Sequence, residues 1–208
     1  MPTSDVVWLQ TGRQEGELHW KDGKLHLSEK PIRWEDVRSI SRQSQVGRSS
    51  PGQAVQFLNG ETWQVEILTM SKGKLTLNGK VYGQRTVELS SVRSLEFSPS
   101  SKIAGKSRPG ILYRSSGRPV PGKLIWIKKE DVGIDCPLGI VPLPRPGLVR
   151  YIMPEAKEEQ TVSVQGGDEI GLRDGSILMG KVRIENEQVI LEIPTLETIS
   201  VPWENLRY

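Results

Sequence analysis

The sequence predicts an all-β protein. Val, Ile, Leu and Trp gather in runs of four to eight residues, and 21 Gly and 14 Pro are spread over the 208 residues. This composition is typical of short strands joined by turns. No stretch shows the apolar spacing of an amphipathic helix, so helices are not expected.

A short segment recurs four times along the chain. Each copy has an extended start, a tight polar or Pro-containing corner, and then an apolar residue followed by Arg. The copies are IRWEDVRSI (32–40), VELSSVRSL (87–95), PLPRPGLVRYI (142–152) and SVPWENLRY (200–208). Their matching arginines, Arg38, Arg93, Arg150 and Arg207, are spaced by 55, 57 and 57 residues. A near-constant period indicates one supersecondary unit copied four times.

The repeat divides the chain into four expected β segments. They are segment 1 (1–43), segment 2 (54–98), segment 3 (109–153) and segment 4 (168–208). Stretches rich in Ser, Gly, Pro and Lys are expected to be exposed linkers at 44–53, 99–108 and 154–167. Each segment is near the lower size limit for folding alone, so neighbours are expected to share surface.

The clearest strand pattern is in segment 1, where apolar and polar residues alternate. The residues expected to face inward are Leu18, Trp20, Leu25 and Leu27, and those expected to face outward are Glu17, His19, Lys21, Lys24 and His26. Asp22-Gly23 between them predicts a two-residue hairpin turn, because both turn positions need positive φ. The expected register pairs Lys21 with Lys24, Trp20 with Leu25, His19 with His26 and Leu18 with Leu27. Similar turns are expected at Lys72-Gly73 and Asn186-Glu187.

Two parts of the repeat resemble the small SH3-like and Sm-like β-barrels. The closing elements IRWEDVRSI and VPWENLRY are similar to their strand, 3₁₀ turn and final strand, and the pattern from Val7 to Leu18 is similar to the first Sm motif. The resemblance implies four tandem small barrels. It does not imply RNA binding of the Sm kind, because none of the four corners has the Arg-Gly pair of those proteins.

The repeat is also similar to tandem β modules of bacterial envelope or secreted proteins, through Leu172-Arg173-Asp174-Gly175 with Gly180, and Pro202 ahead of Leu206. A four-bladed β-propeller is the alternative fold, and it would place the strand of Arg207 beside segment 1. The variable linkers favour a string of barrels.

Charge is unevenly distributed along the chain. Residues 1–43 carry 7 basic and 7 acidic side chains, 44–107 carry 8 and 4, 108–153 carry 8 and 3, and 154–208 carry 5 and 11, which gives net charges of 0, +4, +5 and −6. A basic middle can attract an anionic partner, and an acidic end can hold segment 4 against its neighbours or against another copy of the chain. Lys123, Lys128 and Lys129 are the candidate residues for a weak interaction with an anionic polymer such as nucleic acid.

Four of the six tryptophans occupy matching positions in pairs. Trp20 and Trp126 alternate with Leu18 and Leu124 and are expected in the core. Trp34 and Trp203 stand in closing corners, where a Trp can cover the core or form an exposed platform for a sugar ring or a Pro-rich peptide. These two are the candidate interaction residues for a carbohydrate-binding module, and cover of the core is the favoured interpretation.

The sequence contains no nucleophile motif and no phosphate-binding loop, so no catalytic residue, cofactor or metal is expected. Glu35-Asp36 and Glu130-Asp131 lie in predicted turns, a poor basis for divided acid and base roles. The only two histidines, His19 and His26, are interpreted as a cross-strand surface pair, because a zinc site needs three or four ligands. The only cysteine, Cys136, excludes an internal disulfide.

These observations predict a non-catalytic structural or interaction protein that presents repeated β surfaces for protein assembly or adhesion. The expected partner is a protein or a second copy of the chain. Carbohydrate is the first alternative ligand, and nucleic acid is the less favoured one. No segment is long and apolar enough for a membrane span. A complete chain starting MPTSDVVW would be cytoplasmic, whereas an excised piece of a longer protein would suit the cell envelope or the exterior.

Overall fold

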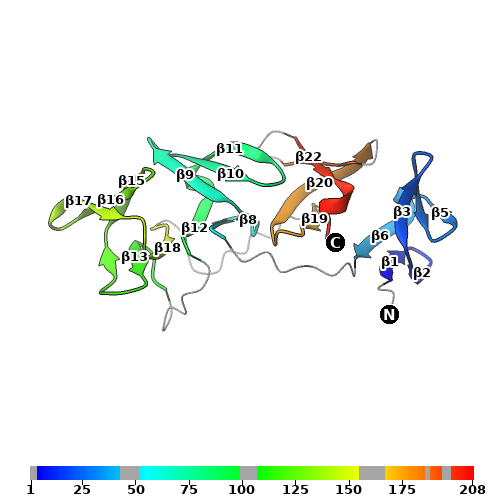
Figure 1. Ribbon diagram of the computed structural model, residues 1–208, viewed down its shortest axis with the longest axis horizontal. Coiled ribbons are helices and arrows are strands. Elements are labelled where there is room, and N and C mark those ends of the chain that lie inside the picture. Colours follow the sequence, from blue (N-terminus) through cyan, green and yellow to red (C-terminus); the bar gives the residue numbers. More distant parts are fainter. Residues whose placement is uncertain (1–3, 43–51, 99–106, 155–166, 186–187, 194–197) are drawn as a thin grey trace. The chain divides into compact units, whose positions relative to one another are not determined.

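The computed structural model describes residues 4–42, 52–98, 107–154, 167–185, 188–193 and 198–208. In these residues the regular structure is strand, with single turns of 3₁₀ helix between some strands (Figure 1). The all-β prediction is confirmed. None of the helical turns in the described ranges is long and apolar enough to cross a membrane. The predicted linkers fall largely outside these ranges.

The chain forms two compact units. Unit 1 comprises Met1–Ser49 with Gly167–Tyr208, and unit 2 comprises Ser50–Gly166. Segments 1 and 4 therefore share unit 1, and segments 2 and 3 share unit 2.

The strands of unit 1 come from both ends of the chain. Segment 1 contains β1 (Asp5–Leu9), β2 (Gly12–Gly16), β3 (Leu18–Lys21), β4 (Lys24–Leu27), β5 (Lys30–Ile32), the 3₁₀ turn η1 (Trp34–Asp36) and β6 (Val37–Ser41). Segment 4 contains β19 (Asp168–Gly171), β20 (Ile177–Glu185), β21 (Gln188–Glu192), β22 (Ile199–Pro202) and η3 (Trp203–Asn205).

Unit 2 is continuous in sequence. Segment 2 contains β7 (Ala54–Phe57), β8 (Thr62–Gln64), β9 (Glu66–Ser71), β10 (Lys74–Gly79), β11 (Gly83–Glu88), η2 (Leu89–Ser91) and β12 (Val92–Glu96). Segment 3 contains β13 (Ile111–Arg114), β14 (Val120–Pro121), β15 (Lys123–Ile127), β16 (Asp131–Cys136), β17 (Gly139–Pro144) and β18 (Leu148–Ile152).

The same order of strand pairing occurs in segments 1 to 3, and segment 4 repeats part of it. The opening strand pairs with the next strand and also with the closing strand, as in β2-β1-β6, β8-β7-β12 and β14-β13-β18. The following strands pair in succession, as in β3-β4-β5, β9-β10-β11, β15-β16-β17 and β20-β21-β22. In segment 4 the opening strand β19 pairs with β20, and a bridge between Leu172 and Leu206 links the opening and closing parts. Within the described residues none of these sheets closes on itself.

A bulge marks the start of the closing strand in segments 1 to 3. Its register skips Arg38 in β6, Arg93 in β12 and Val149 in β18. The structural equivalent of Arg38 and Arg93 in segment 3 is therefore Val149, and the match with Arg150 was wrong by one residue. The Arg-Pro-Gly turn before β18 is one residue shorter than the predicted alignment required, and it replaces the 3₁₀ turn found in the other three segments.

The predicted hairpin of segment 1 is confirmed. The structure pairs Leu18 with Leu27, His19 with His26, Trp20 with Leu25 and Lys21 with Lys24. Asp22 and Gly23 both have positive φ, 52° and 71°, as a two-residue turn requires. Lys72 and Gly73 repeat this conformation at 49° and 76°, whereas Asn186-Glu187 lies outside the described residues.

The core of each segment is formed by the inward residues of its strands. Leu18, Leu25 and Leu27 are buried, but Trp20 is only half-buried. Trp126 is also half-buried, because a bulge in β15 between Leu124 and Trp126 interrupts the alternation on which its prediction depended. The largest fully buried side chains include Trp63, Ile67, Leu75, Leu77, Leu95, Leu112, Ile134, Leu148, Tyr151, Leu172 and Leu178.

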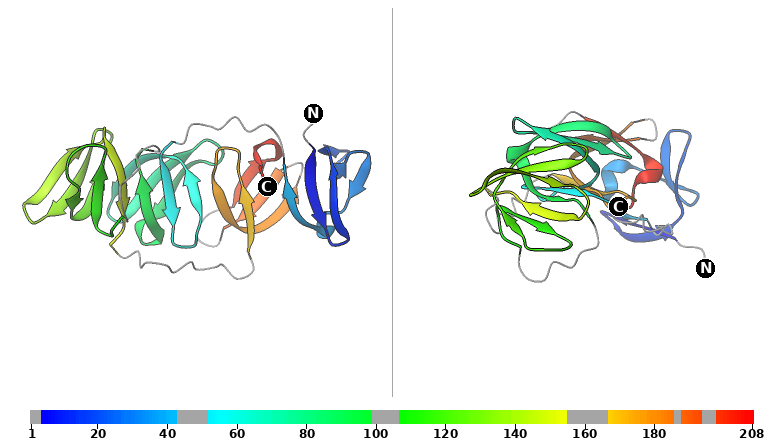
Figure 2. Two further views of the ribbon diagram at one scale, coloured as in Figure 1. Left: turned by 90° about the horizontal axis from the view of Figure 1, so that it is seen from below. Right: turned by 60° about the vertical axis from the view of Figure 1, so that its left-hand side comes forward.

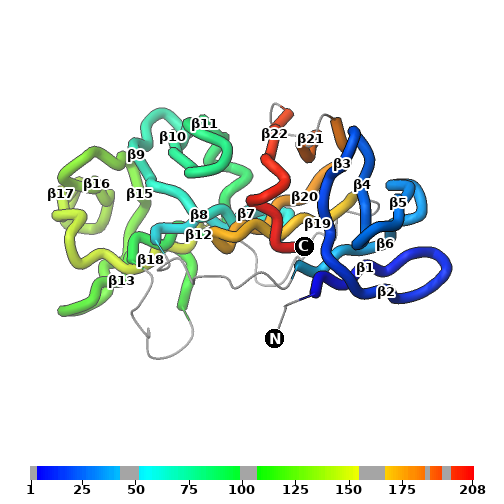
Figure 3. Tube along the Cα trace, turned by 45° about the vertical axis from the view of Figure 1, so that its right-hand side comes forward, coloured from blue at the N-terminus to red at the C-terminus, as the bar shows by residue number. Residues whose placement is uncertain are grey.

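The two segments of unit 2 are joined by strands that occupy equivalent places in each. The closing strands β12 and β18 pair antiparallel, and β9 pairs with β15 through Met70 and Ile127 (Figure 3). Across the β12–β18 pair, Arg150 forms an ion pair with Glu96 at 2.6 Å. Each closing strand thus lies between its own opening strand and the closing strand of the other segment.

In unit 1 the C-terminal segment lies beside segment 1, as the blue and red strands of Figure 2 show. The backbone N–H of Arg42 donates to the carbonyl oxygen of Arg207 at 2.9 Å, and an Arg42 side-chain N–H donates to the carbonyl oxygen of Trp203 at 3.0 Å. Arg207 therefore lies beside segment 1, as the propeller alternative also required, although it is not part of a strand.

Candidate functional site

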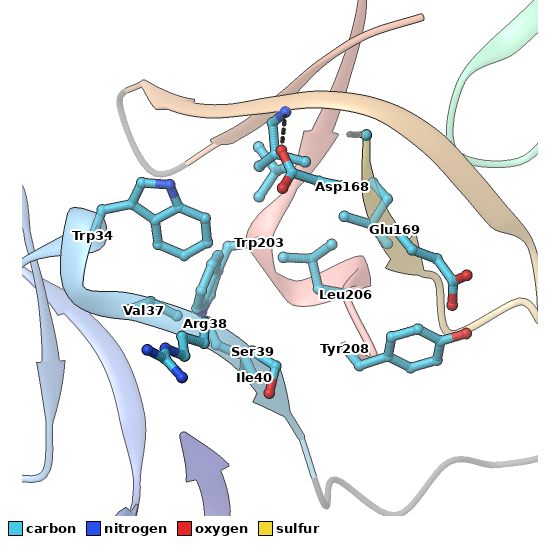
Figure 4. A pocket seen from close by; sticks show the side chains of 14 residues that line it. Trp34, Val37, Arg38, Ser39, Ile40, Asp168, Glu169, Trp203, Leu206 and Tyr208 are labelled. Atoms are coloured by element: carbon cyan, nitrogen blue, oxygen red, sulfur yellow. Dashed lines mark hydrogen bonds between the residues drawn. The ribbon is translucent and has the colours of Figure 1, made fainter. Parts of the chain in front are cut away.

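Two of the candidate tryptophans line one groove in unit 1. Trp34 begins η1 and Trp203 begins η3, so the same corner position of segments 1 and 4 supplies both rings. The groove has a volume of about 420 Å³. Figure 4 shows Trp34 and Arg38 at one end, Trp203 and Leu206 in the middle, and Glu169 and Tyr208 at the other end.

Trp203 belongs to the wall of the groove. Its side chain is 7% exposed, its ring meets the edge of Trp20 at 5.6 Å between centroids, and the Arg42 guanidinium lies 5.5 Å from its ring centroid. Burial lowers the pKa of Arg42 despite the nearby Asp5 carboxylate. These contacts make Trp203 a cover of the core, which the sequence favoured, and not an exposed platform.

Trp34 presents more of its surface to solvent. It is half-buried, and η1 holds it at the mouth of the groove because the chain turns there from β5 into β6. The turn is fixed by Arg33 and Asp36, whose side chains form a salt bridge at 2.9 Å. Asp36 of the Glu35-Asp36 pair is thus engaged in the corner itself.

Charges of both signs lie along the groove. Arg38 is exposed on the side of segment 1, and Asp168 and Glu169 are exposed on the side of segment 4. Asp168 accepts a hydrogen bond from the backbone N–H of Val182 at 2.9 Å, which holds that carboxylate in place. Burial, followed by the charge and hydrogen bond of Glu169, raises the pKa of Tyr208. The groove therefore offers an aromatic face, a guanidinium and a carboxylate to one ligand.

The candidate lysines are exposed in unit 2. Lys123 is in β15, and Lys128 and Lys129 follow that strand. The Nζ atom of Lys128 lies 5.2 Å from the Trp126 ring centroid, and the Trp126 indole N–H donates to Asp131 at 2.8 Å. Asp131 of the Glu130-Asp131 pair is thus also engaged in a structural contact.

Lys123 lines a second groove, with a volume of about 520 Å³. Its walls are mainly apolar and come from both segments of unit 2. They include Leu58, Met70, Leu89, Val92, Leu124 and Met153, with Lys72 as the other charged residue. Lys128 and Lys129 are not part of this groove.

Two basic residues that the sequence counted toward a positive surface are used inside unit 2. Arg145 donates hydrogen bonds to the carbonyl oxygens of Ile67 at 2.7 Å and Lys128 at 3.2 Å, and its guanidinium pKa is lowered by burial. Arg150 is paired with Glu96. The net charge of segments 2 and 3 therefore overstates the positive charge available to a partner.

The two histidines stack on each other, with ring centroids 5.7 Å apart and planes 26° from parallel. Both are half-buried, so they are less solvated than the sequence suggested. Over the described ranges, no group of three or more His, Cys, Asp and Glu side chains is placed to hold a metal ion.

Arg38, Glu169 and Tyr208 were not among the candidates, although they line the Trp34 groove. They would have been found only by knowing that segment 4 packs on segment 1. No protein-family model matches the sequence, and no curated protein matches it significantly. The interpretation of function therefore depends on the fold and on these grooves.

Proposed function

We propose that this protein is a non-catalytic assembly protein made of four small SH3-like segments that bind protein partners in grooves between paired segments. The recurring order of strand pairing supports the four-segment description. In a propeller blade the four strands pair in succession, whereas here the opening strand lies between the second and the closing strand. This difference favours the SH3-like description over the propeller.

The observation that carries the binding proposal is the groove that joins Trp34 and Trp203. Its volume lies in the range of ligand sites, and it combines apolar walls with a few polar groups. An extended protein segment suits it, because Trp34 can contact an apolar side chain while Arg38 and Glu169 reach polar groups at opposite ends. Tryptophan and arginine are the residues most often dominant in protein interfaces.

The test is selection of a displayed random-peptide library on the full chain, followed by affinity measurements with the selected peptides. Trp34→Ala should weaken binding roughly tenfold or more, as loss of an interface tryptophan does. Trp8→Ala is the matched control, because Trp8 is 47% exposed in the same unit and does not line the groove. Equal affinities of the Trp34→Ala variant and the unmodified chain would contradict the proposal.

Carbohydrate binding remains the first alternative. The half-buried Trp34 ring, with carboxylates nearby, favours it, whereas the burial of Trp203 removes one of the two platforms it would use. Soluble oligosaccharides that quench tryptophan fluorescence in the unmodified chain but not in Trp34→Phe would support this alternative over peptide binding.

Binding of an anionic polymer is the second alternative, and the exposure of Lys123, Lys128 and Lys129 favours it. Retention on heparin should then fall steeply with salt, because binding releases counterions. Reversal of the three charges should abolish retention. Salt-independent retention would eliminate this alternative.

A further inference from the structure

We propose that the β16–β17 hairpin of one copy of this chain docks into the apolar groove of unit 2 in a second copy. This inference depends on the proposed assembly function and names the partner. Two features of unit 2 carry it: an exposed apolar hairpin tip and an apolar groove that the described side chains leave open.

The tip is unusually apolar for a surface. Leu138 is 91% exposed and Ile140 is 55% exposed, and of the described large apolar residues only Trp8 is also strongly exposed. Leu138 lies in the turn and Ile140 is the second residue of β17, with Gly139 between them at a φ of 92°. We name these two side chains the knob. Neighbouring apolar side chains at one exposed tip are typical of an interaction site, whereas scattered ones are not.

The groove is suited to receive apolar side chains. Met70 and Met153 line it together with aliphatic residues, and methionine adapts its shape to different partners. The high exposure of Leu138 shows that the knob does not occupy this groove in its own chain.

The charges of the hairpin and of the groove also favour this docking. Residues 130–144, which form the knob hairpin, contain three acidic residues and no basic residue. The charged residues that line the groove are Lys72 and Lys123, and neither forms an ion pair with another described residue. Within one chain Asp135 lies across from Lys123 in the β15–β16 register, so part of this charge is already balanced. Of the two lysines, Lys72 is therefore expected to attract a docked acidic hairpin more strongly.

A second copy could instead associate by adding a strand to the outer edge of this hairpin, but the sequence of β17 disfavours that mode of association. β17 is the last strand of its sheet. Pro142 and Pro144 are two residues apart in it, so their backbone nitrogens point to the same edge of the strand. Proline has no N–H to donate, so this edge is a poor template for another strand. Contact through the knob side chains is the mode that remains.

The first measurement is the mass of the full chain in solution from micromolar to millimolar concentration. The unmodified chain should associate, and Leu138→Lys should raise the dissociation constant at least roughly tenfold, because a positive charge on the knob cannot enter an apolar groove that already contains Lys72 and Lys123. Trp8→Lys is the matched control and should leave association unchanged. Lys72→Glu should weaken association and reduce its dependence on salt.

The second measurement places the knob in the groove directly. A nitroxide is attached to Cys136, the only cysteine, in one copy, and ¹³C-methyl methionine is introduced into a Cys136→Ser copy. Of the four methionines, Met70 and Met153 line the groove, and their signals should broaden in the mixture. If the label disturbs the half-buried Cys136, Pro137→Cys in the Cys136→Ser chain provides a second attachment site.

A chain that stays monomeric overturns this inference, as does association that Leu138→Lys leaves unchanged or a mixture in which the Met70 and Met153 signals do not broaden. Peptide binding that depends on Trp34 would survive each of these results, so failure of the knob is distinguishable from failure of the proposed function.

Discussion

Leu95 of β12 lies directly opposite Tyr151 of β18, and the pairing on either side of them is symmetric. The N–H of Phe97 donates to the carbonyl oxygen of Val149 at 2.8 Å, and the N–H of Met153 donates to that of Arg93 at 3.0 Å. Counted from the bulge, Phe97 and Met153 are equivalent, as are Arg93 and Val149. The two segments of unit 2 thus meet as two subunits meet across a two-fold axis.

Unit 1 contains part of the same contact. Arg42 is the fourth residue after the bulge of β6, as Phe97 is after the bulge of β12. Arg207 follows η3 at the position that Arg38 has after η1, which is the bulge position. The hydrogen bond from Arg42 N–H to Arg207 O therefore corresponds to the bond from Phe97 N–H to Val149 O. This hydrogen bond is the one counterpart in unit 1 of the contact between segments 2 and 3, because no strand of segment 1 pairs with a strand of segment 4 in the described residues. The segments therefore share surface in a nested order, segment 1 with segment 4 and segment 2 with segment 3.

Arg145→Met should lower the free energy of unfolding of unit 2 by about 2 kcal/mol. The guanidinium crosses from the corner of segment 3 to carbonyl oxygens of β9, and a hydrogen bond to a charged group contributes about 1.5–3 kcal/mol. Urea unfolding followed by circular dichroism would measure it. Arg118→Met, at an exposed arginine of the same segment, should change stability by less than about 0.5 kcal/mol. Equal losses in both variants would contradict the bridging role.

Arg42→Met should destabilise unit 1 by a similar amount, about 2 kcal/mol. It removes the hydrogen bond to the Trp203 carbonyl and the cation over the Trp203 ring, and it leaves the buried Asp5 carboxylate without the guanidinium 3.9 Å away. Guanidine unfolding monitored by tryptophan emission would measure the loss. The control is Arg13→Met, whose side chain is half exposed. A loss no larger than that of the control would show that Arg42 does not join the segments.

Local structure could be predicted from the sequence where the turn determines it. The Asp22-Gly23 turn set the register of β3 and β4 correctly, because a two-residue loop leaves one possible pairing. The half-burial of Trp126 could not be predicted, because a bulge has no clear sequence signal and shifts every side chain after it.

The candidate site was predicted only in part for a different reason. The repeat placed Trp34 and Trp203 at equivalent corners, but alignment alone could not show that both rings line one groove. In unit 1 the pairing of segments depends on contacts between residues more than 150 positions apart, such as Arg42 and Trp203 with a separation of 161. Alternation and turn chemistry act over a few residues and carry no information at that distance.

Gly133→Ala should destabilise unit 2 by about 1–3 kcal/mol, the usual cost of overpacking. A Cβ at this position would lie 2.3 Å from the Trp126 ring, which covers the glycine from the neighbouring strand. The ring would have to move and would strain its hydrogen bond to Asp131. Thermal unfolding and the Trp126 emission would report both effects. Gly52→Ala, where a Cβ would meet nothing within 4 Å, should be nearly neutral.

Tyr208→Phe should remove a pH dependence from the stability of unit 1. The pKa of Tyr208 is raised above its ordinary value of 10.0 by burial and by Glu169, so the folded state favours the protonated phenol. This contribution is fully present below pH 10.0 and is lost as the pH rises through the higher folded pKa, since the unfolded chain then loses its proton first. The free energy of unfolding, measured by urea at pH 8 and pH 11, should therefore fall more in the unmodified chain than in Tyr208→Phe. In Glu169→Gln the free energy of unfolding should fall less between pH 8 and pH 11 than in the unmodified chain, because the negative charge near the phenol is gone. Identical pH dependence in all three chains would show that the phenol is not held neutral beside Glu169 at the end of the Trp34 groove.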